Sequence, residues 1–123
     1  FDKIAIANPE TAPYGAAAIE TMRALGVHDT LAPRIVRGSN IAQAYQFVAT
    51  GSAELGFVAL SQIATVAGGS RWVVPQHLYA PISQDAVILA TASDNGTARH
   101  FMTFLEGPKA RAIIARYGYG LAE

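Results

Sequence analysis

Residues 3–15 read KIAIANPETAPYG, and this stretch decides the fold. The apolar run at 3–7 predicts a short strand. A turn follows, and Pro13 then opens an alanine-rich helix, because its fixed φ suits the first helical position. Thr11 is the expected N-cap of that helix. A strand, a turn and a helix start place several backbone N–H groups at one point, since the first turn of a helix has no internal partners for them.

The same pattern recurs further along the chain. The first helix is expected to end at Gly26, and a second helix begins at Ile41 and ends at Gly51. A third, short helix is expected from Leu60 or Ser61 to Val66. Further strands are predicted at 34–37 (RIVR), 54–59 (ELGFVA) and 71–74 (RWVV). Alternating strands and helices indicate an α/β fold with a mainly parallel sheet flanked by helices.

The pattern changes after Pro81. A longer apolar strand is expected at 85–91 (DAVILAT), followed by two amphipathic helices separated by Gly107-Pro108. Three apolar residues line each of these helices: Phe101, Phe104 and Leu105 on the first, and Ile113, Ile114 and Tyr117 on the second.

Composition excludes several classes of function. The 123 residues include nine basic and nine acidic side chains, so a basic surface for nucleic acid is not expected. The chain contains no cysteine, which excludes disulfides, thiol catalysis and thiolate metal sites. No run approaches the roughly 20 apolar residues of a membrane span.

Enzymatic chemistry has little support in the sequence. The histidines His28, His77 and His100 fall on different predicted elements, and none has the spacing of a metal site. Glu10 is the one candidate for a general base in the turn at 8–15, and nothing pairs with it. We therefore predict no catalytic residue, no metal and no cofactor, with an α/β enzyme kept as a weak alternative.

The turns at 8–15 and 38–41 both follow predicted strands. In open parallel sheets, ligands bind at the carboxyl ends of the strands. Helix starts at that edge can bind an anion through backbone N–H groups and the helix dipole, without charged side chains. The candidate donors are the N–H of Tyr14 or Gly15, the N–H groups of Asn40 and Ile41, and the hydroxyls of Ser39 and Thr11.

Four motifs together carry a family resemblance: KIAIANPETAPYG, RIV leading to GSNIAQA, ELGFVALSQ, and FLEGPKARAIIARYGYGL. In this order and spacing, they resemble the second lobe and C-terminal region of periplasmic molybdate-binding proteins. Those proteins are the substrate-binding components of bacterial ABC importers and have the type II periplasmic binding fold. The resemblance covers nearly all of the chain.

The resemblance implies a non-enzymatic solute-binding protein that holds molybdate or tungstate between two lobes. It places Tyr14 and Ile41 at the two ligand-binding helix starts. Ser39 and Asn40, proposed as ligand-binding residues from the position of their turn, directly precede Ile41. Some family members add a tyrosine hydroxyl where this chain has Ala59, so that donor is absent here. It also implies a periplasmic location, a membrane-bound ABC permease as partner, and a signal peptide outside this chain.

The same resemblance divides the chain in two. Residues 1–82 correspond to the second, ligand-binding lobe. Residues 83–123 correspond to a return strand and two C-terminal helices that pack on the first lobe, which this chain does not include. We expect their apolar stripes to be covered by a separately supplied first lobe or by a second protomer, giving a dimer, through domain swapping for example. The alternative function is a protein–protein assembly module without high-affinity ligand binding.

Overall fold

A computed structural model describes residues 1–120. The chain divides into two compact units, Phe1–Ile82 and Ser83–Glu123. Residues 121–123, at the end of the predicted second segment, lie outside the described residues. The lobe assigned to each segment stays a prediction.

The first unit is built on a three-stranded parallel sheet with the order β2-β1-β3. The strands are β1 (Ile4–Ala7), β2 (Ile35–Gly38) and β3 (Leu55–Gly56). All four residues of β1 are buried, as expected for a central parallel strand covered on both faces. The predicted α/β class, with a parallel sheet flanked by helices, is confirmed.

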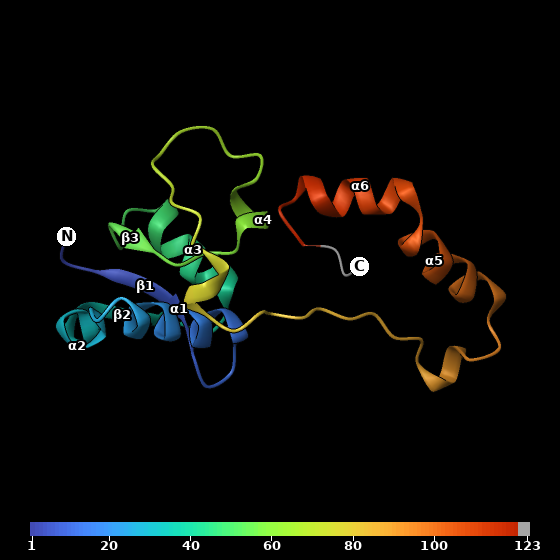
Figure 1. The fold of residues 1–123 in the computed structure, drawn as a ribbon, viewed down its shortest axis with the longest axis horizontal. Helices are drawn as coiled ribbons and strands as arrows, with labels where there is room; N and C mark the ends of the chain where they lie inside the picture. The colour runs from blue at the N-terminus through green and yellow to red at the C-terminus, as the bar shows by residue number, and fades with distance from the viewer. Residues whose placement is uncertain (121–123) are drawn as a thin grey trace. The chain divides into compact units, whose positions relative to one another are not determined.

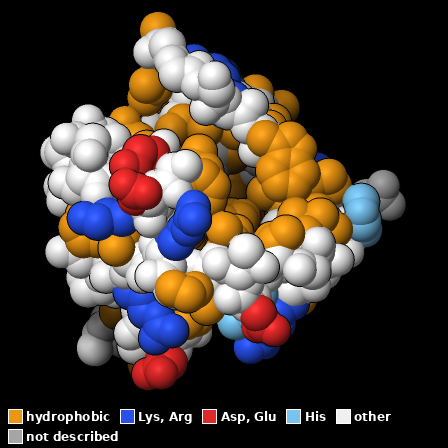
Figure 2. Space-filling model, turned by 90° about the vertical axis from the view of Figure 1, so that its left-hand side faces the viewer, with side chains coloured by type: hydrophobic (Ala, Val, Ile, Leu, Met, Phe, Trp, Pro, Cys, Tyr) orange, Lys and Arg blue, Asp and Glu red, His pale blue; other side chains and the backbone are white. Residues whose placement is uncertain are grey.

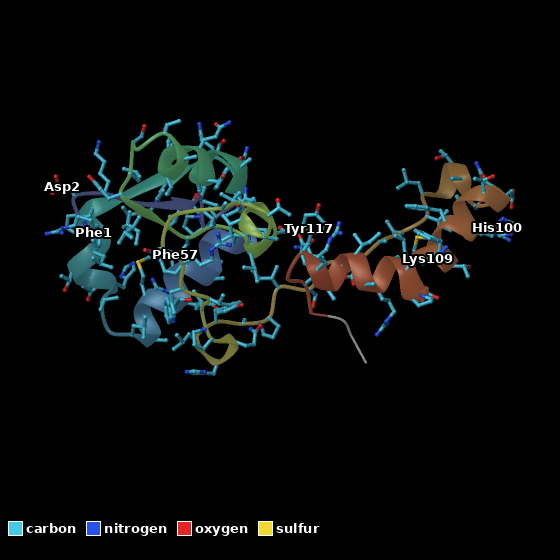
Figure 3. The ribbon with its side chains drawn as sticks, turned by 90° about the horizontal axis from the view of Figure 1, so that it is seen from above. Phe1, Asp2, Phe57, His100, Lys109 and Tyr117 are labelled. Atoms are coloured by element: carbon cyan, nitrogen blue, oxygen red, sulfur yellow. The ribbon has the colours of Figure 1, made fainter. Side chains whose placement is uncertain are left out.

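Helices cover both faces of this sheet, with α1 (Pro13–Ala24) and α2 (His28–Leu31) on one side and α3 (Ile41–Ala49) on the other (Figure 1). The core on the α1 side joins Ile6 of β1 to Ala18, Ile19 and Met22 of α1. Phe57, labelled in Figure 3, packs against this cluster from the chain after β3.

The predicted boundaries of α1 are nearly correct. Pro13 is its first residue, and Gly26 follows its end with a φ of 68°, the left-handed conformation expected there. The N-cap, however, is Ala12 and not Thr11. The Asn8 carbonyl accepts from the amides of both Thr11 and Ala12, at 3.2 and 2.9 Å, so the turn extends one residue further before the helix begins.

Two predicted elements are displaced or shortened. Arg34 belongs to the 3₁₀ turn η1 (Ala32–Arg34), so β2 starts and ends one residue later than expected. The third strand keeps only Leu55–Gly56, and the following helix, α4 (Leu60–Ile63), stops before Val66. The chain leaves the sheet early because the N-cap of α4 is already at Ala59.

The predicted strand at 71–74 is wrong. Gly68 and Gly69 both have positive φ and turn the chain away from the sheet. The Arg71 guanidinium donates to the carbonyls of Ile63 and Val66, at 2.7 and 2.6 Å, and so ties this segment to the end of α4. A short 3₁₀ turn, η2 (Gln76–Leu78), follows, and the Ala80 amide donates to Oε2 of Glu20 on α1 at 2.8 Å.

The predicted strand at 85–91 is also wrong. Its last residues enter the 3₁₀ turn η3 (Ala90–Ala92), and Val87 is 78% exposed. A strand needs a neighbour for its hydrogen bonds, and the other regular elements described in the second unit are helices.

The two predicted C-terminal helices are confirmed as α5 (Gly96–Glu106) and α6 (Pro108–Arg116), which pack on each other. Asn95 caps α5 by accepting from the Ala98 amide at 3.2 Å. His100 and Lys109 mark the two helices in Figure 3. Across residues 1–120, no helix has the length and apolar character to cross a membrane.

Candidate functional site

Two helix starts lie at one edge of the sheet. Ala7 and Gly38 are paired at the carboxyl ends of β1 and β2, and the Asn8 amide donates to the Gly38 carbonyl at 2.8 Å. The turns at 8–15 and 38–41 therefore leave neighbouring strands side by side. Each leads directly into a helix, so the positive ends of the α1 and α3 dipoles lie at the same edge.

Asn8 organises the first turn. Its Oδ1 accepts from the Glu10 amide at 3.1 Å, which forms an Asx turn. Its backbone carbonyl accepts from the amides of Thr11 and Ala12. Sequence reasoning missed this role, although an Asn-Pro pair directly after a strand is a typical signal for it. Glu10 itself is exposed, as is Thr11.

Gly15 lets α1 approach the end of β1 closely. A Cβ at this position would lie 2.1 Å from the Ala7 carbonyl oxygen, so only glycine fits. The Gly15 amide already donates to the Ala12 carbonyl at 2.9 Å, which uses one of the two donors expected here. Tyr14, the second residue of α1, is half-buried in the same first turn.

The second turn is held by a reciprocal cap. Asn40 is the N-cap of α3, in extended conformation, and its Oδ1 accepts from the Gln43 amide at 2.9 Å. Oε1 of Gln43 reaches back to accept from the Ser39 amide at 2.7 Å. This arrangement resembles a capping box, displaced by one residue. The predicted site residues Ser39 and Asn40 thus have defined structural roles at the helix start.

The first residues of α3 present backbone donors. Ile41 and Ala42 occupy its first two helical positions, where N–H groups have no partner inside a helix. The Ser39 hydroxyl oxygen accepts weakly from Nδ2 of Asn40, at 3.4 Å, which leaves the hydroxyl proton able to donate. Gly38 allows α3 to approach the end of β2 closely, because a Cβ at this position would lie 2.8 Å from the Ala44 amide nitrogen.

The start of α4 is tied to the start of α3 by one side chain. Oε1 of Gln62 accepts from the Ala59 amide at 3.0 Å, and its Nε2 donates to the Ile41 carbonyl at 3.2 Å. Sequence reasoning missed Gln62. Its position three residues after the N-cap was the available signal for the first of these bonds.

Charged side chains of both signs are mixed on the face of the molecule drawn in Figure 2, where Lys and Arg lie among Asp and Glu. An open hollow of about 370 Å³ beside α1 shares only Pro9 with the turn at 8–15, and its other lining residues are Ala16, Ile19, Glu20, Arg23, His28 and Arg37. It is not the candidate site.

The histidines lie on separate elements, His28 on α2, His77 on η2 and His100 on α5. Nδ1 of His28 lies 3.0 Å from Oδ1 of Asp29. In the described part of the chain, no three His, Asp or Glu residues form a group that could hold a metal ion.

The geometry is that of two helix starts that present backbone N–H groups, and comparison with known proteins identifies the family of the chain. The family described as "Bacterial extracellular solute-binding protein" matches residues 1–120. The chain belongs to this family. Proteins of this family bind solutes and are not enzymes, which sets aside the enzyme alternative that depended on Glu10.

Individual members of the solute-binding family confirm the resemblance found in the sequence. The molybdate-binding protein ModA of Rhodobacter capsulatus is 54% identical over 97% of this chain, and that of Azotobacter vinelandii is 54% identical over 98%. The solved periplasmic molybdate-binding protein of Azotobacter vinelandii matches with a TM-score of 0.90 and 42% identity.

The match covers only part of each relative. The alignment spans 47% and 49% of the two ModA sequences, and 55% of the solved structure, while covering 97–100% of this chain. The chain thus spans about half the length of these relatives.

Proposed function

We propose that this chain supplies one side of a binding site for a tetrahedral oxyanion, molybdate or tungstate, in the solute-binding component of an ABC import system. The observation that carries the proposal is the pairing of Asn8 with Gly38, which brings two helix starts to one sheet edge. The relatives from Rhodobacter capsulatus and Azotobacter vinelandii are molybdate-binding proteins, which supports the choice of ligand.

The proposed ligand donors are backbone amides. Tyr14 donates from the start of α1, and Ile41 and Asn40 donate from the start of α3, with the Ser39 hydroxyl beside them. A neutral donor set suits a doubly charged oxyanion, because aligned N–H dipoles stabilise its charge without a counter-ion. Side chains of these residues then matter less than their backbone positions.

The rest of the proposal concerns the whole protein. Residues 1–82 act as the second lobe, and residues 83–123 return towards a first lobe that provides the remaining donors. Closure of the lobes buries the anion, and the closed form is presented in the periplasm to a membrane permease.

Titration calorimetry with molybdate, tungstate and sulfate tests the ligand. For the 123-residue chain we expect weak binding of molybdate and tungstate, since only one side of the site is present. Amide resonances of Tyr14 and Ile41 should move in a ¹H–¹⁵N NMR titration with molybdate. No movement of either amide at saturating molybdate would refute the site. A Kd on the order of 1 nM for a monomer would refute the proposal that this chain supplies only one side of the site.

A second candidate function follows from the exposed apolar side chains of α5 and α6. Phe101, Phe104 and Ile113 are 58%, 48% and 50% exposed. An exposed stripe of this kind is typical of a protein–protein contact, made with the first lobe or with a second protomer. Dimerisation that is independent of molybdate and unaffected by changes at Ile41 would favour assembly over ligand binding.

A further inference from the structure

Gln62 joins two helix starts that are far apart in sequence. It is half-buried on α4, and its amide accepts from Ala59 at 3.0 Å and donates to Ile41 at 3.2 Å. The Ala59 N–H can only donate and the Ile41 carbonyl can only accept. A primary amide is therefore well suited to satisfy both, whereas a carboxylate satisfies only the first.

The second bond acts on the backbone next to the proposed donor. The Ile41 carbonyl belongs to the same peptide group as the Ala42 N–H, in the first turn of α3. A donor on the carbonyl oxygen fixes the plane of that peptide and polarises it, which strengthens the dipole at the helix start. The peptide on the other side of Ile41 is fixed separately, because the Asn40 carbonyl accepts from the Ala44 amide at 3.1 Å.

We propose that Gln62 is a positioning residue of the oxyanion site. It holds the first turn of α3 against the start of α4 and polarises the Ile41–Ala42 peptide beside the Ile41 amide. This inference rests on the proposed function. It makes the start of α4 part of the site, although its N-cap residue Ala59 carries no hydroxyl to offer a ligand.

The test compares Gln62→Met, which removes both bonds at similar side-chain volume, with Gln46→Met at an exposed position of α3. NMR of the ligand-free chain measures the ¹³C chemical shift of the Ile41 carbonyl, which moves upfield when a hydrogen bond to that oxygen is lost. An NMR titration measures the Kd for molybdate. We expect Gln62→Met to shift the carbonyl resonance and to weaken molybdate binding about three- to tenfold, the effect of one hydrogen bond. Gln46→Met should change neither.

A carbonyl resonance that does not move, or a molybdate Kd that stays within about twofold of wild type, overturns the proposal. If Gln62→Met fails to fold, Gln62→Glu keeps the acceptor for Ala59 and loses the donor to Ile41. Gln46→Glu then controls for the added charge, and the same two readouts decide. The wild-type titration separates the two failures, because unresponsive Tyr14 and Ile41 amides would refute the proposed function itself.

Discussion

The amide of Asn8 donates to the carbonyl of Gly38 at 2.8 Å, directly after the last paired residues of β1 and β2. The two residues are distant in sequence, yet this bond fixes where both turns leave the sheet. The α1 and α3 starts are neighbours for that reason, which is the arrangement that the proposed oxyanion site requires.

The N–H of Ile41 can be removed without disturbing the helix. Proline is accepted at the first helical position, and Asn40 before it already has the extended conformation that a following proline requires, with φ −153° and ψ 176°. We expect Ile41→Pro to weaken molybdate binding about 10- to 100-fold, as for a hydrogen bond to a charged group, with unchanged helix content by circular dichroism.

Ile41→Ala is the matched control for that change. It removes the same side chain and keeps the N–H, so molybdate binding should stay within about threefold of wild type. Equal affinities for the proline and alanine variants, measured in the same NMR titration, would remove the Ile41 amide from the site.

Gly15 is expected to be intolerant of any side chain. A Cβ there would lie 2.1 Å from the Ala7 carbonyl oxygen, which is backbone and cannot rotate away. Gly15→Ala should lower the free energy of unfolding by about 3 kcal/mol or more, measured by urea denaturation. Gly96→Ala, where a Cβ meets nothing within 4 Å, should change it by less than about 1 kcal/mol. A mild effect at Gly15 would mean that α1 can move away from β1.

Local signals made the helix starts predictable from the sequence. Pro13 marks the first residue of α1, and Asn40 directly before an apolar periodic run marks the start of α3. Gly26 ends α1 because it adopts positive φ, as glycine does there. The expected place of the site follows from these local features together with the parallel order of the strands.

Long-range hydrogen bonds were not predictable in the same way. The bond from Gln62 to Ile41 depends on where β3 ends, and that strand is shorter than its apolar run suggests. Residues 71–74 have strand-forming side chains, but Arg71 binds carbonyls near α4 and holds them off the sheet. Strand formation needs a neighbour, which side-chain pattern alone does not reveal.

The Glu54 carboxylate should make stability depend on pH. The Lys3 amide donates to Oε2 of Glu54 at 2.9 Å. This bond has the largest effect, and a second bond from the backbone amide of Glu54 itself adds to it, so that the pKa of Glu54 lies below its ordinary value of 4.5. A lowered folded-state pKa stabilises the fold above the unfolded-state pKa, and the contribution is lost as the pH falls through the folded-state value.

Glu54→Gln keeps an oxygen acceptor and removes the charge. We expect a lower melting temperature than wild type at about pH 7, and a difference that shrinks at about pH 3, below the unfolded-state pKa, as the pH falls towards the folded-state pKa. Because this side chain is exposed, the effect should weaken as salt is added. A difference that does not change between the two pH values would contradict the assignment to the Glu54 charge.

The apolar stripe of α5 should cause self-association of the 123-residue chain. The rings of Phe101 and Phe104 stack with centroids 6.3 Å apart, and both are about half exposed. Burial of a large apolar side chain contributes roughly 1.5–3 kcal/mol, so a second copy gains by covering them. Light scattering should give a mass above the 12.9 kDa of one chain. The double variant Phe101→Ser, Phe104→Ser should shift this towards the monomer, while His100→Ser on the same helix should not. A wild-type chain that stays monomeric as its concentration rises would exclude this surface as a contact between copies.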